Sequence, residues 1–209
     1  MSAILGKKVG MTQLFLEDGT VVPVTVIEAG PCTVTAVREP DRDGYSAVQL
    51  SFGEVAERKL SKPELGHLKK AGAPPSRHLV EFRDIELPGD GDTKIGDEVT
   101  VAAFEEGQKV KIAGTTVGKG FQGGIKRHNF SRGPETHGSH NTRAPGSIGA
   151  SAFPARVFKG MRMPGHMGAN RRTQKGLEIT RIDAERNLLR IKGSIPGHKK
   201  SLVEVRLDG

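Results

Sequence analysis

Residues 119–175 most limit how this chain can fold, because this stretch is strongly basic and contains little apolar surface. It holds 11 Lys/Arg side chains and one acid, Glu135, while the rest of the 209-residue chain holds 21 basic and 23 acidic residues. Only ten of its residues are Ile, Val, Met or Phe. That is too little apolar surface to offset about 1–2 kcal/mol of backbone entropy per ordered residue. We therefore expect a near-neutral folded body that carries a long basic loop, ordered by a binding partner.

The composition of this loop indicates which partner orders it. Its cations repel one another in isolation, whereas phosphates neutralise them and release condensed counterions. Aromatic rings among basic residues are typical of proteins that stack on RNA bases. Half of the chain's eight phenylalanines lie in the loop, namely Phe121, Phe130, Phe153 and Phe158. The alternative is that these rings pack into a small cluster with Met161, Met163 and Met167.

Outside the loop, short β-branched runs separated by turn signals predict an antiparallel β-barrel or β-sandwich. One of these turn signals is the Pro-Gly-Asp-Gly sequence at 88–91. The body is expected to be discontinuous, comprising residues 1–118 and 177–209, with the loop at 119–176. The predicted strands are 21–27, 32–38, 47–52, 78–82, 98–101, 110–117, 188–192 and 202–206.

A single helix is predicted at about residues 61–72. Ser61 and Glu64 have the spacing of a capping box, and Pro63 lies in the first turn, where a missing N–H costs little. Gly72 can adopt the left-handed conformation that ends a helix. We expect this helix to be about nine residues long and to lie on the surface of the barrel.

The termini and the single cysteine add few constraints. Cys32 lies in an apolar run and excludes an internal disulfide, so we interpret it as a small core residue. The apolar part of residues 1–10 is too short for a secretory or membrane segment. We expect a soluble cytoplasmic protein with no membrane partner.

Several motifs that suggest catalysis or cofactor binding lack the residues that such chemistry needs. The Gly-Lys-Gly-Phe-Gln-Gly run at 118–123 has the glycine spacing of a dinucleotide loop, but no apolar-periodic helix follows it. We interpret it as a flexible exit from the barrel. The loop histidines have no cysteine or paired carboxylate to complete a metal site, and no nucleophile is paired with a base. We therefore expect no enzyme activity, metal, cofactor or small-molecule substrate.

Specific motifs along the whole chain resemble one known family. They include Gly-Lys-Lys-Val-Gly-Met-Thr at 6–12, Lys-Arg-His-Asn-Phe at 126–130, Arg-Ala-Pro-Gly-Ser-Ile-Gly at 143–149 and Arg-Val-Phe-Lys-Gly-Met-Arg-Met at 156–163. On these residues the chain is similar to the bacterial ribosomal protein L-three (L3) family of the large subunit. The sequence departs from the family at two places: the glutamine that many members carry methylated is Ala150 here, and the usual tryptophan before Asn-Phe is His128.

The resemblance implies a six-stranded translation-protein barrel with a long extension that threads into 23S rRNA. In the family this extension reaches toward the peptidyl transferase centre, and the protein acts in early subunit assembly. It also implies neighbouring large-subunit proteins, among them L-fourteen and L-nineteen. The alternative function is a non-ribosomal RNA chaperone or a general nucleic-acid-binding module.

The charge pattern and the resemblance together give one set of side chains expected to bind rRNA. This set is Lys119, Phe121, Lys126, Arg127, His128, Phe130, Arg132, His137, His140, Arg143, Ser147, Arg156, Phe158, Lys159, Arg162, His166, Arg171, Arg172 and Lys175.

Overall fold

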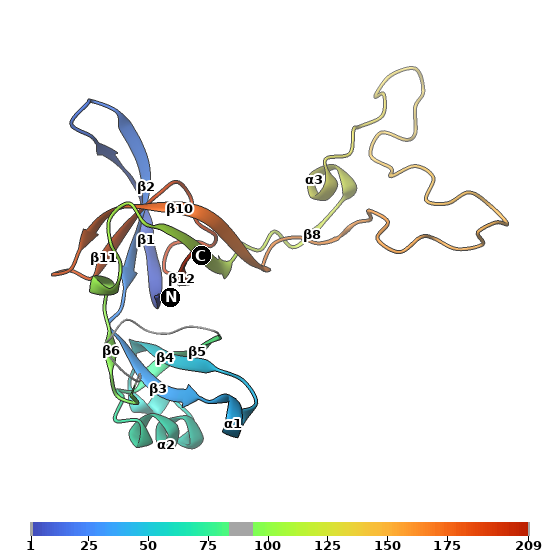
Figure 1. Cartoon of the computed structure of the whole chain (residues 1–209). Helices are drawn as coiled ribbons and strands as arrows, with labels where there is room; N and C mark the ends of the chain where they lie inside the picture. The colour runs from blue at the N-terminus through green and yellow to red at the C-terminus, as the bar shows by residue number, and fades with distance from the viewer. Residues whose placement is uncertain (1, 84–93, 209) are drawn as a thin grey trace. The chain divides into compact units, whose positions relative to one another are not determined.

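The computed structural model describes residues 2–83 and 94–208 and divides the chain into two units (Figure 1). The first unit, which we call the body, comprises Met1–Thr116 and Arg171–Gly209, and the second, which we call the arm, comprises Val117–Asn170. The turn predicted at 88–91 lies outside the described residues.

A closed antiparallel barrel of six strands forms one part of the body. The strands follow one another around the barrel in the order β1-β12-β7-β10-β11-β2. Alternate residues point inward, so that Ile4, Ile27, Ile112, Ile179 and Ile191 are fully buried. This confirms the mainly β fold and the six-stranded barrel. The bounds are β1 (Ala3–Phe15), β2 (Val21–Ala29), β7 (Lys109–Thr115), β10 (Arg171–Asp183), β11 (Leu188–Lys192) and β12 (Leu202–Leu207).

A second, four-stranded sheet contains the other strands of the body, which match four of the eight runs that the sequence predicts. Its order is β5-β4-β3-β6, and Cys32, Leu50 and Phe82 from its strands share a continuous core with Ile4 and Leu5 of the barrel. Apolar alternation identifies which face of a strand is buried, but it does not identify the sheet to which the strand belongs. The bounds are β3 (Cys32–Arg38), β4 (Ala47–Glu54), β5 (Ser76–Arg83) and β6 (Glu98–Val99).

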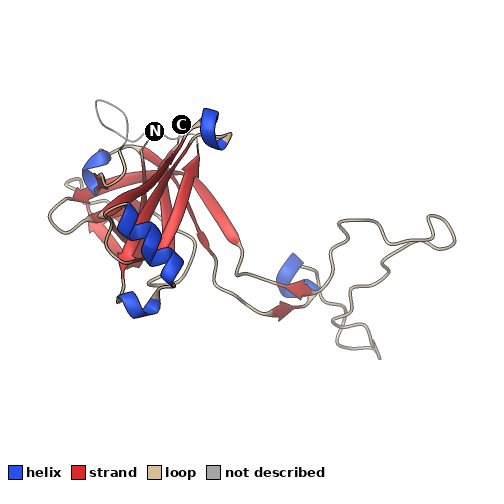
Figure 2. Ribbon diagram, turned by 90° about the horizontal axis from the view of Figure 1, so that it is seen from below, coloured by secondary structure: helices blue, strands red, loops and turns tan. Residues whose placement is uncertain are grey.

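The body also contains several short helices (Figure 2). Helix α2 (Lys62–Lys70) packs Leu68 with Leu60 and with Leu79 of β5, so it covers the second sheet and not the barrel surface as predicted. The predicted strand 98–101 is shorter, because its end forms a 3₁₀ turn. The remaining short elements are α1 (Pro40–Asp43), η1 (Glu57–Lys59) and η2 (Val101–Ala103). Across the described ranges, no helix combines the length and apolarity needed to cross a membrane.

The ends of α2 are formed by the residues that the sequence indicates. The Ser61 side chain accepts from the backbone N–H of Glu64 at 3.5 Å, and the Glu64 carboxylate accepts from the backbone N–H of Ser61 at 2.9 Å. Gly72 is left-handed, with φ of +69°. The capping box and the glycine stop are therefore confirmed.

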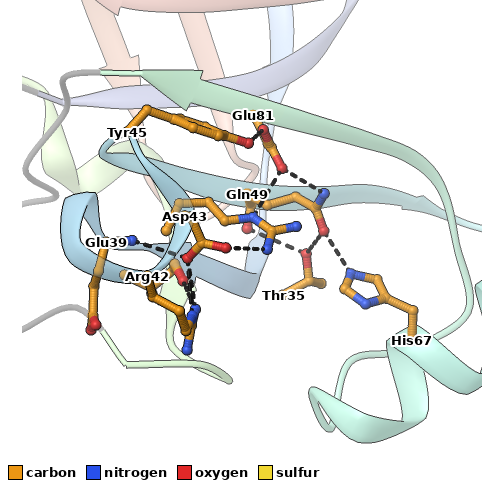
Figure 3. A network of polar contacts seen from close by, with 10 residues as sticks. Thr35, Glu39, Arg42, Asp43, Tyr45, Gln49, His67 and Glu81 are labelled. Carbon is orange, nitrogen blue, oxygen red and sulfur yellow. Dashed lines mark hydrogen bonds and ion pairs between the residues drawn. The ribbon is translucent and has the colours of Figure 1, made fainter.

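A polar network fixes α2 to the second sheet (Figure 3). His67 Nε2 donates to Gln49 Oε1 at 2.6 Å, and the Thr35 hydroxyl donates to the same oxygen at 2.8 Å. Gln49 Nε2 in turn donates to Glu81 at 3.5 Å, and the Tyr45 hydroxyl donates to Glu81 at 2.9 Å. The helix is thus held by directional bonds as well as by the packing of Leu68.

Two barrel strands of 13 residues each, β1 and β10, lie outside the predicted runs. Glycine interrupts the apolar pattern of β1, where a Cβ on Gly6 would lie 2.7 Å from the Glu28 carbonyl oxygen. The first six residues of β10, 171–176, are all exposed. Backbone pairing with neighbouring strands holds both segments, and this pairing leaves no hydrophobic pattern in the sequence.

Candidate nucleic-acid interface

The arm has no hydrophobic core of its own. All of its residues, 117–170, are described, and none of them is buried, whereas the body contains every buried apolar residue of the described chain. Eight of its side chains are Lys or Arg and one is an acid. Apolar packing therefore contributes little to its order, and like charges oppose its compaction.

A two-stranded ribbon joins the two halves of the arm at its base. Strand β8 (Phe121–Gln122) pairs with β9 (Gly165–His166), so that Phe121 lies opposite His166. On the flanking residues, the backbone N–H of Lys119 donates to the Met167 carbonyl at 2.8 Å. Three predicted RNA-binding residues, Lys119, Phe121 and His166, are thus brought together, and the Phe121 ring is 77% exposed.

Helix α3 (Gly124–His128) follows this ribbon and is not among the elements that the sequence predicts. Arg127 Nη1 donates to the Met163 carbonyl at 2.6 Å, and His128 Nε2 donates to the same oxygen at 3.0 Å. A Cβ on residue 165 would lie 2.6 Å from Arg127 Nη1, so a larger residue there would displace the end of the Arg127 side chain. Bonds to residues distant in sequence, which local periodicity cannot reveal, hold this segment.

The aromatic rings of the arm divide into one packed ring and three exposed ones. The Phe130 ring lies 5.9 Å from the His128 ring, and a Cβ on residue 124 would lie 2.9 Å from it. Phe121, Phe153 and Phe158 are 77%, 90% and 60% exposed, respectively. Three of the four rings therefore present surface that a planar base can cover.

Most of the predicted basic side chains in the arm have no acidic partner. Within the described ranges, the only ion pair made by an arm residue joins Arg132 to Glu135 at 3.0 Å. Ser147 donates instead to the carbonyl of Gly149, at 2.8 Å. Further predicted residues that lie exposed along the arm are Lys126, His137, His140, Arg143, Arg156, Lys159 and Arg162.

The last three predicted residues, Arg171, Arg172 and Lys175, lie on β10 in the body. There Arg171 and Lys175 line a pocket of about 260 Å³ on the outer face of the barrel. Two further basic residues of this pocket, Lys111 and Arg206, were not identified from the sequence. Each of these two residues alternates with buried valine or isoleucine in its strand. This alternation is a sequence pattern that predicts an outward-facing side chain.

Neither a cluster of metal-ligating side chains nor a reactive thiol is found among the residues that the structure describes. Among these there is no group of three His, Cys, Asp or Glu side chains that could hold a metal ion. Burial raises the pKa of the Cys32 thiol to about 12. A thiol in that state is neither a nucleophile nor a ligand at neutral pH.

Comparison with known proteins gives consistent matches. The sequence pattern of the family described as "Ribosomal protein L3" matches residues 91–208. The large ribosomal subunit protein uL3 of Synechococcus elongatus is 53% identical over 202 residues, which cover 97% of this chain and 93% of that protein. The uL3 protein of Pelotomaculum thermopropionicum is 53% identical over 203 residues, covering 97% and 95%. That of Acaryochloris marina is 50% identical over 203 residues, covering 97% and 94%.

Proposed function

Because the chain belongs to the ribosomal protein L3 family, we propose that its arm binds 23S rRNA and so anchors the protein in the large ribosomal subunit. Members of the family are structural, non-enzymatic components of that subunit, and the ribosome places this chain in the cytoplasm. In this function the chain contributes fixed charge and shape, while the chemistry of peptide transfer belongs to the RNA.

The observation that carries the proposal is the arm's composition together with its exposure. Eight basic side chains, one acid and no buried residue occupy residues 117–170, all of which are described. Phosphates supply the missing negative charge, and the exposed rings supply surfaces for stacking. Phosphate contacts carry no sequence information, so the shape of the folded RNA selects the site.

The family resemblance extends the proposal to position and timing. We propose that the arm reaches toward the peptidyl transferase centre and that the protein joins the subunit early in assembly. The proposed neighbours on the body are the large-subunit proteins L-fourteen and L-nineteen.

Sedimentation after a high-salt wash tests the anchored role against that of a loosely bound RNA chaperone. Large subunits carrying the tagged chain are washed in concentrated salt and centrifuged, and the chain is measured in pellet and supernatant. An anchored component stays with the subunit, because RNA surrounds the arm and detachment requires the RNA to unfold. Release into the supernatant at a salt concentration that retains other core proteins contradicts the proposal and supports the chaperone.

A further inference from the structure

The pocket on the outer barrel face has a defined floor and a basic rim. Three adjacent strands, β12, β7 and β10, form it. The small side chain of Ala113 lies between Thr173 and Glu204, its register partners on either side, and so forms the floor. Lys111, paired with Arg206 across the strands, contributes to the rim. The hollow therefore exists because the side chain of Ala113 is shorter than those of the residues around it.

A β-bulge places a second lysine beside Lys111. In the pairing of β10 with β7, Gln174 lies opposite Ile112 and Leu177 opposite Val110, so two residues of β10 face Lys111 alone. These are Lys175 and Gly176. Gly176 has φ of +68°, and its N–H donates to Asp208 at 2.8 Å, so the bulge is fixed by both backbone conformation and a hydrogen bond.

Glu204 organises the two arginines of the rim. Its carboxylate lies 2.5 Å from the Arg171 guanidinium and 3.3 Å from that of Arg206. The Arg206 guanidinium also lies over the Phe82 ring, 4.6 Å from its centroid. One acid thus orients two cations that retain further N–H donors, while Lys111 and Lys175 make no ion pair with any described residue.

We propose that this pocket binds a backbone phosphate of rRNA, as a second contact separate from the arm. The proposal rests on the proposed function, since it takes 23S rRNA as the partner. Four cations against one acid leave an excess of three positive charges, and oriented guanidiniums suit the oxygens of a phosphate.

An RNA partner is favoured over an acidic protein surface because two of the strands that form the pocket, β7 and β10, connect directly to the arm. Thr115 ends β7, Arg171 begins β10, and the two residues pair. The arm is the connection between them, so the pocket is built on the strands that lead directly into and out of the proposed RNA-binding segment.

The test measures the salt dependence of binding between the full-length chain and 23S rRNA. The variant Lys111→Ala/Lys175→Ala removes the two unpaired cations of the rim. Because each neutralised phosphate contributes about 0.7 to 0.9 to the slope of log K against log salt, loss of one contact makes the slope shallower by about that amount. The affinity of this variant for 23S rRNA at low salt should also fall.

Two matched variants control for charge and for folding. Lys111→Arg/Lys175→Arg keeps both charges in the pocket and should retain the wild-type slope. Lys59→Ala/Lys62→Ala removes the same charge from exposed positions just before and at the start of α2. It should change the slope less than the Lys111→Ala/Lys175→Ala variant does. Thermal unfolding followed by circular dichroism checks that all variants fold.

The outcomes separate this inference from the proposed function. If wild type binds with a steep salt dependence and the alanine variant has the same slope, the pocket proposal is overturned while the function of the arm stands. An equal change in the Lys59/Lys62 variant also overturns it. Unchanged rRNA binding with lost incorporation into subunits assigns the pocket to a protein partner. If wild type itself shows no salt-dependent binding to 23S rRNA, both proposals fail.

Discussion

At the scale of single residues, Arg143 provides a direct test of the arm's charge. It is exposed and makes no ion pair with the described residues. Arg143→Glu should lower affinity for 23S rRNA about tenfold or more, because one charge-assisted hydrogen bond contributes about 1.5–3 kcal/mol and the new carboxylate repels phosphate. Filter binding measures the effect. Arg58→Glu, an identical change on the body at an exposed position, is the control, and equal losses for the two variants contradict a specific role for Arg143.

Ala150 gives a second prediction at this scale, which follows from the family resemblance. Methylation of a glutamine at this position needs a side-chain amide nitrogen, and alanine has none. The peptide spanning residues 147–156 should therefore carry no added methyl mass when the protein is purified from its own ribosomes. Mass spectrometry of that peptide measures this directly, and a mass increase of one methyl group contradicts the prediction.

Cys32 should behave as a core residue in a labelling experiment. Because burial raises the pKa of its thiol to about 12, the thiolate is scarce at any pH where the protein is stable, and the reagent cannot reach it. Less than one thiol per chain should react with a thiol reagent in the native protein, and one should react in guanidinium chloride. Rapid stoichiometric labelling under native conditions would mean that this part of the core opens easily.

At the scale of elements, the capping box of α2 sets the stability of that helix. Ser61→Ala should lower the free energy of unfolding by about 1 kcal/mol, because the alanine cannot accept the N–H of Glu64. Ser61→Asp keeps an acceptor and should cost less. Urea denaturation followed by circular dichroism measures both, and equal stabilities for wild type and Ser61→Ala contradict the role of the cap.

The same box predicts a dependence on pH. Hydrogen bonds from the backbone N–H and hydroxyl of Ser61 lower the pKa of the Glu64 carboxyl. A carboxyl whose pKa is lowered by folding contributes stability above its ordinary pKa and loses it as the pH falls through the lowered value. The stability difference between wild type and Glu64→Gln should therefore be present at neutral pH and disappear in acid.

At the scale of the whole molecule, the body should fold without the arm. Thr115 and Arg171 pair directly, so a short glycine-serine linker can replace residues 118–169 while both strands remain intact. The shortened chain should unfold in one cooperative transition, because loop-closure entropy changes slowly with length. It should bind 23S rRNA much more weakly. Loss of the unfolding transition in calorimetry would show that the body depends on the arm.

Sequence alone determined the features that depend on composition and on local pattern. The excess of Lys and Arg over acids identified a segment unable to form a core, and the short β-branched runs identified the mainly β body. The spacing of Ser61 and Glu64 identified α2. These properties are visible in sequence because the interactions that cause them lie within a few residues of one another, or depend only on how much apolar surface is present.

Only the tertiary structure decided which strands share a sheet, where β1 and β10 run, and which basic residues meet on the barrel. The predicted strands divide between a barrel and a second sheet, although both bury the same kinds of side chain. Helix α3 depends on bonds to Met163, and the pocket depends on Lys111, Lys175 and Arg206 from three strands. The physical reason is that nearly every residue carries the same backbone N–H donor and C=O acceptor. The local sequence therefore does not show which distant strand or loop these groups bond to.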